Sequence, residues 1–257
     1  MRYLDLTLPT AAENLALDEA LLEEAEAAGQ PTETLRVWEP PAPVVVVGRS
    51  SRIEGEIHRD ACRALDVEVL RRISGGASIV AGPGCLMYAL VLSYRLRPAL
   101  RASDDAHRFV LGRLAAALEP HVPGVRCRGT SDLALDRLKF SGNSVRCRRD
   151  HLLYHGTLLY DFPLELIDRC LAMPPRQPPY REGRKHADFV ANLPLTSETI
   201  RRALVAAWQA VEPLADWPRE LMARLVARKY GRPEWNEGQP CPAARTTRRS
   251  AGTSAPP

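Results

Sequence analysis

Lysine is scarce in this chain of 257 residues, because only three of the 35 cationic side chains are lysines, Lys139, Lys185 and Lys229. Arginine is therefore the default surface cation, and a retained lysine is a candidate for work that a guanidinium cannot do. Chance survival on the surface remains the alternative for two of the three. The net charge of only +4, much of it near the end of the chain, gives little support to nucleic-acid binding.

Long apolar runs and paired cysteines are also missing. No stretch of about eighteen apolar residues exists, and the first residues show neither a basic leader nor a cleavage site. We therefore expect a soluble, cytoplasmic protein that does not engage a membrane. The cysteines are single, far apart and not clustered with histidine at metal spacing, which predicts reduced thiols and no zinc. They are Cys62, Cys85, Cys127, Cys147, Cys170 and Cys241.

Length and composition are sufficient for one large domain, since 257 residues with 45% apolar side chains can bury a sizeable core. Helical patterns predict a surface helix over 13–28 and further helices over 104–118, with Ser103 as N-cap, 164–172, 197–211 and 219–229. Strands are predicted over 35–38, 44–47, 67–72 and 85–94, and a β-meander over 131–160. The run 44–47 is expected to be buried on both faces. Mixed helices and strands indicate an α/β protein.

The segment RRISGGASIV joins two arginines to a glycine turn between strands. Glycines let backbone N–H groups approach an anion closely, and Arg71 or Arg72 would supply positive charge. We therefore expect Ser74, Gly75 and Gly76 to hold a phosphate or a carboxylate. A glycine hairpin with an incidental arginine pair explains the segment equally well.

A second polar group lies in KFSGNS, which begins at Lys139. Alternation along a strand predicts that Lys139, Ser141 and Asn143 point to one side, so that an ammonium, a hydroxyl and an amide converge on one ligand. Such a group suits the polarisation of a carbonyl or phosphoryl oxygen. A lone lysine in a strand is usually a solvated edge residue. Because this strand lies between apolar runs, we favour a functional role for Lys139.

Five segments, taken in order, resemble the successive signatures of the lipoate-protein ligase and octanoyltransferase family. They are NLALDEALL at 14–22, RRISGG at 71–76, SDLAL at 131–135, KFSGNS at 139–144 and HGTLL at 155–159. The resemblance implies a catalytic domain over residues 1–236, with a mixed, largely antiparallel β-sheet flanked by helices and shared in outline with biotin ligases. The composition of residues 237–257 predicts a disordered tail.

The resemblance also implies a chemistry. Ligases of this family use ATP to convert lipoate or octanoate, held in an apolar tunnel, into an acyl-adenylate, and pass the acyl group to a carrier-domain lysine. The carrier would be a 2-oxoacid dehydrogenase subunit or the glycine cleavage H protein. Lys139 would be catalytic, and Asp132 would place the nucleotide or its Mg²⁺. The other residues implied to bind substrate or nucleotide are Arg71, Arg72, Ser74, Gly75, Gly76, Ser141, Gly142, Asn143, His155 and Gly156.

The chain departs from the ligase pattern after the glycine turn. Most ligases continue with a third glycine and a His-Asp pair, whereas this chain has Ala77 and the segment AGPGC. The GPG turn is more similar to octanoyltransferases, which take octanoyl from an acyl carrier protein through a cysteine thioester. Cys85 and Cys127 are the candidate nucleophiles, although free cysteines are most often small buried hydrophobes. We expect no C-terminal accessory domain, so ligation would call on a separate accessory protein.

Two further hypotheses remain open. The loop 177–189 is too long for a simple connection, and His186 with Arg181, Arg184 and Lys185 would form either an anion-binding lid or a solvated charged surface. A non-catalytic lipoyl-binding or acyl-binding module, or one half of a split ligase, also fits the missing His-Asp pair. Retention of Lys139 argues against such a module. ATP-dependent ligation is the favoured hypothesis, and octanoyl transfer is the alternative.

Overall fold

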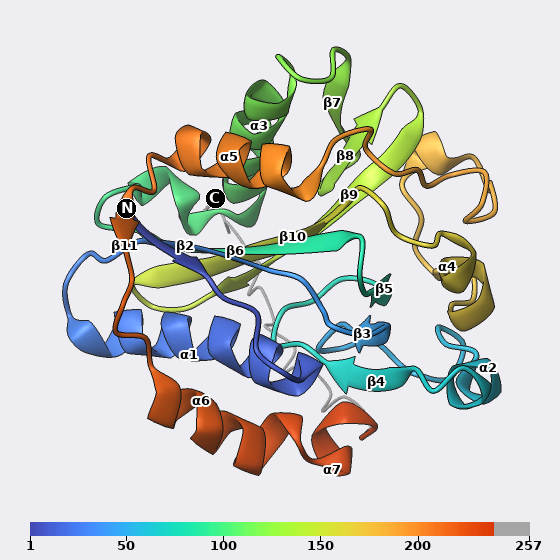
Figure 1. Cartoon of the computed structure of the whole chain (residues 1–257), viewed down its shortest axis with the longest axis horizontal. Helices are drawn as coiled ribbons and strands as arrows, with labels where there is room; N and C mark the ends of the chain where they lie inside the picture. Colours follow the sequence, from blue (N-terminus) through green and yellow to red (C-terminus); the bar gives the residue numbers. More distant parts are fainter. Residues whose placement is uncertain (239–257) are drawn as a thin grey trace, which may run out of the picture.

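The computed structural model describes residues 1–238. Its centre is an eight-stranded sheet, antiparallel throughout except that β11, β1 and β2 run parallel at one edge (Figure 1). This arrangement confirms the expected mixed, largely antiparallel sheet. The strands, in spatial order, are β11 (Glu212–Pro213), β1 (Arg2–Asp5), β2 (Thr34–Trp38), β6 (Cys85–Ser93), β10 (His151–Leu159), β9 (Leu138–Cys147), β8 (Asp132–Leu135) and β7 (Val125–Arg128).

A smaller sheet of three strands carries the glycine turn. Its order is β4 (Glu68–Arg71), β3 (Val44–Val47) and β5 (Ile79–Ala81). Because β4 runs parallel to β3 and β5 runs antiparallel to it, the glycine turn crosses from one side of β3 to the other. The glycine hairpin considered for RRISGG is therefore wrong: the strands that flank the turn are separated by β3. All four valines of β3 are at most 1% exposed, which confirms burial on both faces.

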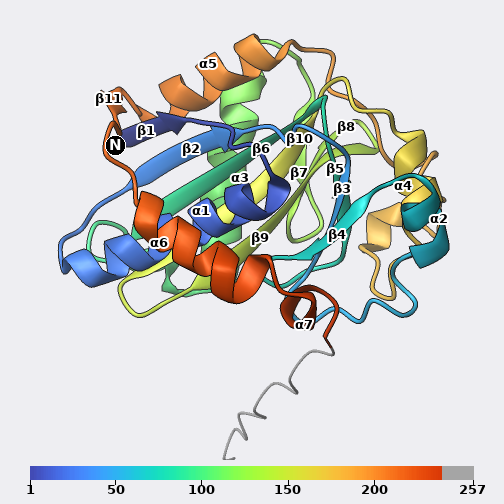
Figure 2. The same ribbon diagram turned by 60° about the horizontal axis from the view of Figure 1, so that its bottom comes forward.

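Helices cover both faces of the large sheet, with α1 and α6 on one side and α3 and α5 on the other (Figures 1 and 2). The helices are α1 (Ala11–Ala28), α2 (Arg59–Ala64), α3 (Ser103–Leu118), α4 (Glu165–Cys170), α5 (Ser197–Trp208), α6 (Arg219–Leu225) and α7 (Pro233–Asn236), with the short turns η1 (Pro98–Arg101), η2 (Pro179–Arg181) and η3 (Val226–Tyr230). Within residues 1–238, none of them has the length and apolar character needed to cross a membrane.

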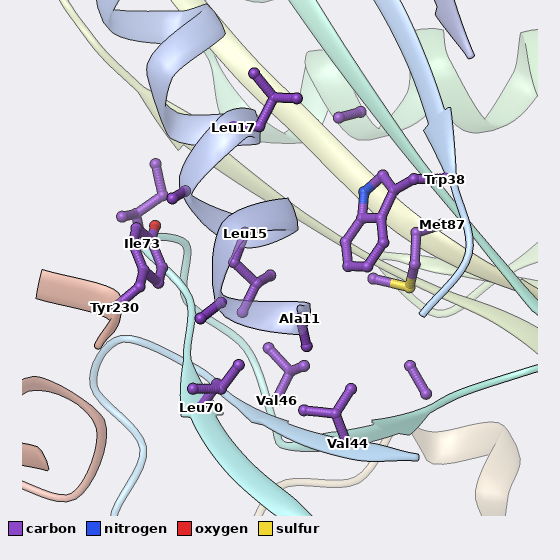
Figure 3. Packing of buried hydrophobic residues seen from close by; sticks show 14 of the residues in the cluster. Ala11, Leu15, Leu17, Trp38, Val44, Val46, Leu70, Ile73, Met87 and Tyr230 are labelled. Atoms are coloured by element: carbon purple, nitrogen blue, oxygen red, sulfur yellow. The ribbon is translucent and has the colours of Figure 1, made fainter. Parts of the chain in front are cut away.

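Helix α1 is buried between the two sheets and η3 (Figure 3). It begins after Thr10, whose hydroxyl accepts from the backbone N–H of Glu13 while the Glu13 carboxylate accepts from the N–H of Thr10. This reciprocal capping box fixes the start of the helix. The expectation of a surface helix over 13–28 is wrong, because most of the helix is buried, including Asp18 and Glu19, which are paired with cations.

The other predicted elements are confirmed with small shifts of their ends. The β-meander consists of β8, β9 and β10, and the later helical patterns correspond to α3, α4, α5 and α6. The N-cap at Ser103 is wrong by one position, since Ser103 is already helical and Ala102 precedes it. Sequence patterns missed β1, β5, β7, β11, α2 and α7, which are all short. Of the predicted tail over 237–257, residues 239–257 lie outside the described part of the chain.

Candidate functional site

Two adjoining cavities lie against the α1 side of the large sheet. One, of about 110 Å³, has mainly apolar walls, and we call it the apolar cavity. The other, of about 450 Å³, is the wider cavity, and it is bordered by the glycine turn and the loop that carries Asp132. Lys139 and Thr157 border both. The apolar cavity is walled by Ile79, Val80, Leu159, Ile167, Leu171 and Val190.

A bulge in β9 determines which side chains reach the cavities. Leu133 of β8 pairs with Ser141, but the next residue, Ala134, pairs with Lys139, so that Phe140 is the extra residue. A bulge of this kind shifts the in-and-out alternation of the strand by one position. Lys139 and Ser141 therefore point to opposite faces of the sheet.

This shift contradicts the predicted convergence of three polar side chains. Lys139 shares its face with Gly142, where an added Cβ would lie 3.0 Å from the Lys139 Nζ. Ser141 and Asn143 hydrogen-bond to each other at 3.0 Å, and the Asn143 amide oxygen accepts from the Tyr88 hydroxyl on the α3 side of the sheet. The convergence of Lys139, Ser141 and Asn143 is wrong because simple alternation does not anticipate a bulge.

Asp132 and the backbone hold Lys139 in a fixed place. The Lys139 Nζ lies 2.7 Å from Asp132 Oδ1, and the Tyr180 hydroxyl donates to Asp132 Oδ2 at 2.9 Å. Burial raises the pKa of Tyr180 above its usual range, so this hydroxyl remains a donor. The backbone N–H of Lys139 donates to Phe189 and its carbonyl accepts from Ala191. An ammonium has three donors, so one ion pair leaves others for a ligand.

The Arg72 side chain holds the glycine turn in place through hydrogen bonds to its backbone. Its guanidinium is buried and donates to the carbonyls of Gly75 at 2.6 Å and Ala77 at 3.0 Å. Burial lowers the pKa of Arg72 to about 10, so it stays charged near neutral pH. Since N–H and C=O of a trans peptide point in opposite directions, the N–H of Gly76 faces away from Arg72. Gly76 borders the wider cavity, where this N–H suits an anion.

Arg71 does not border either cavity, contrary to its predicted role in the acyl and phosphate site. Its Nη1 donates to the carbonyls of Gly48 at 2.8 Å and Ser51 at 2.9 Å, and its Nε to the carbonyl of Trp235 at 3.0 Å. The reason is geometric: consecutive residues of an extended chain point to opposite sides, so Arg71 and Arg72 cannot share one ligand. Arg71 instead fastens the turn after β3 to the C-terminal segment.

A buried polar chain behind the glycine turn links it to α1. His155 Nε2 lies 2.5 Å from Ser74 Oγ, and His155 Nδ1 lies 3.9 Å from Asp18 Oδ2. Asp18 Oδ1 pairs with the fully buried Arg36 at 2.5 Å. Sequence reasoning assigned His155 and Ser74 but missed Asp18 and Arg36. The acidic pair inside the leucine-rich NLALDEALL was a usable signal, because buried charges are rare without a partner.

Asn143 and Gly156 support the site from the opposite face of the sheet. The Asn143 amide donates to the carbonyl of Ser131 at 2.9 Å and so holds the loop that leads into Asp132. A Cβ at Gly156 would lie 1.9 Å from the Asn143 Oδ1, so only glycine allows this arrangement. Both residues border the wider cavity, but the polar atoms of Asn143 are used within the protein.

The candidate nucleophiles Cys85 and Cys127 do not border the cavities. Cys85 is fully buried in the core under α1, and this burial raises its pKa far above the usual range. Cys127 is exposed on β7, and desolvation raises its pKa as well. The thiolate is the nucleophilic form, so raised pKa values disfavour attack. Among residues 1–238, no cysteine contributes to the wall of either cavity.

The segment 172–190, which we call the covering loop, closes the cavities on the side of α4. Arg181 borders both cavities and His186 borders the apolar one, with its Nε2 3.3 Å from the Ala172 carbonyl. Arg184 is used by backbone carbonyls, and Lys185 is exposed. Of the four predicted lid residues, two therefore face the site, one braces the loop and one is a solvated surface charge.

Positive side chains outnumber carboxylates around the cavities. The bordering cations are Arg72, Lys139, Arg176 and Arg181, and the bordering carboxylates are Asp132 and Glu56. Glu56 accepts from the N–H and the hydroxyl of Ser78. No cluster of three or more metal-ligating side chains occurs in the described part of the chain. One carboxylate is still enough for Mg²⁺ when phosphate oxygens supply further ligands.

The relatives of this chain carry two kinds of name, lipoate-protein ligase and octanoyltransferase. A provisionally named lipoate-protein ligase A of Aeropyrum pernix is 30% identical over 223 residues, which is 86% of this chain and 76% of that protein. The octanoyltransferase LipM of Symbiobacterium thermophilum is 28% identical over 271 aligned positions, covering 91% of this chain and 97% of that one. Relatives in Mycoplasma pneumoniae and Mycoplasma genitalium are matched over only 42% and 45% of their own lengths.

The fold is that of solved lipoate-protein ligases. A bi-partite lipoate protein ligase from Thermoplasma acidophilum, studied with its E2 lipoyl domain, superposes with a TM-score of 0.78 at 20% identity, covering 93% of this chain and 96% of that one. A lipoate-protein ligase A bound with ATP gives a TM-score of 0.78 at 20% identity, covering 93% and 98%. Residues 10–208 match the family model of the lipoyl protein ligase A/B catalytic domain. The chain therefore belongs to the lipoyl protein ligase A/B catalytic domain family, a family of enzymes.

Proposed function

We propose that this chain activates lipoate, or a related short-chain acid, with ATP and transfers the acyl group to a lysine of a carrier domain. One observation carries the proposal: Lys139 stands where an apolar cavity meets a wider cavity lined by cations. Burial of an aliphatic chain contributes about 0.8 kcal/mol per CH₂, which suits the first cavity to the acid. The second suits the phosphates of ATP, and a solved ligase of this fold was obtained with ATP.

In the activation step, a carboxylate oxygen of the acid would form a bond to the α-phosphorus of ATP while pyrophosphate leaves. Negative charge then grows on the phosphoryl oxygens. The Lys139 ammonium, held by Asp132 at 2.7 Å, and the N–H of Gly76 would stabilise this charge from fixed positions. Mg²⁺, held by Asp132 and the phosphates, would add charge compensation there.

In the transfer step, the amine of the carrier lysine would form a bond to the acyl carbonyl carbon. AMP leaves with the electron pair of the broken C–O bond, and the amine gives up one proton to solvent water. Lys139 would donate to the carbonyl oxygen on which charge develops. An E2 lipoyl domain studied with a ligase of this fold supports a lipoyl carrier as partner, either a 2-oxoacid dehydrogenase subunit or the glycine cleavage H protein. Residues 1–236 would form the catalytic domain, with a separate accessory protein taking part where needed.

Octanoyl transfer from an acyl carrier protein is the second candidate function. The alignment that spans 97% of an octanoyltransferase LipM favours it. This route needs a thiol that exchanges with the donor thioester. Cys85 lies two residues before Met87, which borders the wider cavity, but is fully buried, and Cys127 lies two residues before Gly129, which borders the same cavity. The exposed position of Cys127 on β7 and its raised pKa weigh against it.

Exchange of labelled pyrophosphate into ATP tests the proposal. An acyl-adenylate enzyme should catalyse this exchange only when the acid is present, and Lys139→Met should remove it. The measurement is made with octanoate and with lipoate, with and without an added accessory protein. Acid binding without exchange under every condition would favour the non-catalytic module. If the protein shows no acid binding and no exchange under any of these conditions, the ligase proposal is wrong.

A further inference from the structure

Arg181, the last residue of η2, is a buried cation that borders both cavities. It is only 4% exposed, and its guanidinium lies 4.6 Å from the centre of the Phe189 ring. Its Nε donates to the carbonyl of Arg184 at 2.9 Å, and its Nη2 donates to the Met173 sulfur at 3.3 Å. Because a guanidinium has five N–H donors and a thioether is a weak acceptor, most of its hydrogen-bonding capacity remains for a ligand.

Arg184, three residues further along the covering loop, is bonded very differently. Its Nε donates to the Arg181 carbonyl at 3.1 Å, its Nη1 to that of Asp188 at 3.1 Å, and its Nη2 to those of Arg137 at 3.1 Å and Tyr180 at 2.9 Å. Arg184 borders neither cavity. One arginine of the loop therefore holds the backbone, and the other faces the site.

The charge of Arg181 is not balanced by an ion pair within residues 1–238. The carboxylates whose charges reach it, Asp168 and Asp132, are engaged elsewhere. Asp132 pairs with Lys139 at 2.7 Å, and Asp168 accepts from the backbone N–H of Ala187 at 3.0 Å. Burial of a cation without a partner costs free energy that an incoming anion recovers. Lys139 already has its carboxylate, whereas Arg181 forms no ion pair within the described residues.

We propose that Arg181 binds the carboxylate of the free acid, with the acyl chain in the apolar cavity and Lys139 on the same carboxylate. This inference rests on the proposed function and adds the residue that recognises the acid before activation. A planar guanidinium donates two parallel hydrogen bonds to the two oxygens of a carboxylate. The carbonyl of a thioester or an amide offers one uncharged oxygen instead. Arg181 therefore makes the site select free acids over neutral acyl donors.

The test compares the binding of octanoate with that of octanamide, its neutral analogue, to the full chain by calorimetry. The variants are Arg181→Met, Arg181→Lys and, as the control, Lys185→Met, which removes one positive charge from an exposed position in the same loop. Far-UV circular dichroism and thermal midpoints establish that each variant is folded. Binding of a non-hydrolysable ATP analogue is measured in parallel to report on the nucleotide side of the site.

The wild type should prefer octanoate, and Arg181→Met should raise the Kd for octanoate by at least about tenfold, because charge-assisted hydrogen bonds are lost. The Kd of Arg181→Met for octanamide should change little. The Kd of Arg181→Lys for octanoate should be intermediate, and both Kd values of Lys185→Met should resemble those of the wild type. A folded Arg181→Met that still prefers octanoate as the wild type does would overturn the role of Arg181 alone. A wild type that binds octanoate no better than octanamide would also overturn this role, whereas the ligase proposal is decided separately by the pyrophosphate exchange.

Discussion

Gly142 leaves the space that the Lys139 side chain fills. A Cβ at position 142 would lie 3.0 Å from Lys139 Nζ and 3.1 Å from its Cε. The bulge at Phe140 brings these two residues to one face, and Asp132 then fixes the ammonium at 2.7 Å. The site is therefore built for a compact cation at the end of a straight side chain.

Replacement of Lys139 by arginine tests this fit. A guanidinium keeps the charge but is wider than an ammonium, so it cannot occupy the space beside Gly142 in the same way. We expect Lys139→Arg to lower the rate of carrier acylation by at least about 100-fold, the scale of losing one oxyanion donor. The rate is followed by the mass of the carrier domain, and the thermal midpoint should stay near that of the wild type. Wild-type activity in this variant would contradict the assignment.

Gly156 makes a second steric prediction. Gly156→Ala would place a Cβ 1.9 Å from the Asn143 Oδ1 and push Asn143 away from Ser131. We expect a loss of about 1–3 kcal/mol in the free energy of unfolding, as for other overpacked sites, and slower acylation because the Asp132 loop loses its support. Urea unfolding measures the first effect.

Gly112→Ala is the matched control for that substitution. Gly112 lies in α3, with no atom within 4 Å of an added Cβ. Because alanine is the better helix former, this variant should gain about 0.5–1 kcal/mol. Equal stability of the Gly156→Ala variant and the wild type would show that Asn143 can move at no cost.

The buried His186 in the covering loop favours its neutral form. Burial lowers the pKa of His186 from its usual 6.5, and the charges of Arg181 and Lys139 act in the same direction. The Ala172 carbonyl and Asp168 oppose this shift. Above pH 6.5 His186 is neutral in both the folded and the unfolded chain. As the pH falls below 6.5, the unfolded chain takes up the proton first. The free energy of unfolding therefore decreases until the pH reaches the lowered pKa of His186 in the folded chain.

His186→Gln should therefore reduce the pH dependence of stability. Between about pH 7.5 and about pH 5.5, the thermal midpoint of the wild type should fall more than that of the variant. His121→Gln, at an exposed position after α3, is the control and should follow the wild type. Identical pH profiles for all three proteins would contradict a role for neutral His186.

Local patterns predicted most of the elements, and the family resemblance implied which segments meet at the site. The valine run of β3 and the meander of β8 to β10 follow directly from residue types and turns. The side-chain directions at β9 could not be predicted, because a bulge at Phe140 depends on the pairing with β8. The separation of Arg71 from Arg72 could have been predicted from strand alternation. The burial of Asp18 needed its partner Arg36, which lies far away in sequence.

At the scale of the whole molecule, the ends of the described chain fasten the wall of the site. Glu19 of α1 is 2% exposed and accepts from Lys229 Nζ at 2.7 Å and from the Tyr230 hydroxyl at 2.7 Å. The segment that follows η3 then reaches Arg71, which donates to the carbonyl of Trp235 at 3.0 Å. Lys229 therefore has a structural role, whereas Lys139 borders the cavities.

Lys229→Met should weaken the fold and spare the chemistry. It leaves the buried Glu19 carboxylate without its cation, so we expect a loss of about 1–3 kcal/mol in the free energy of unfolding, the usual cost of an unsatisfied buried polar group. Acylation per folded molecule should stay unchanged, because Lys229 borders neither cavity. Chemical denaturation and an activity assay at low temperature separate the two effects. Lys185→Met, at an exposed position, should alter neither quantity.

We propose that a free acid, activated by ATP beside Lys139, is the acyl donor of this protein. The most direct measurement is the mass of an apo carrier domain after incubation with this protein. One reaction contains octanoate and ATP, and the other contains octanoyl acyl carrier protein without ATP. We predict that only octanoate with ATP adds the mass of one octanoyl group to the carrier lysine, and that Lys139→Met prevents the addition. Octanoylation from the acyl carrier protein alone, with none from octanoate and ATP, would contradict the claim.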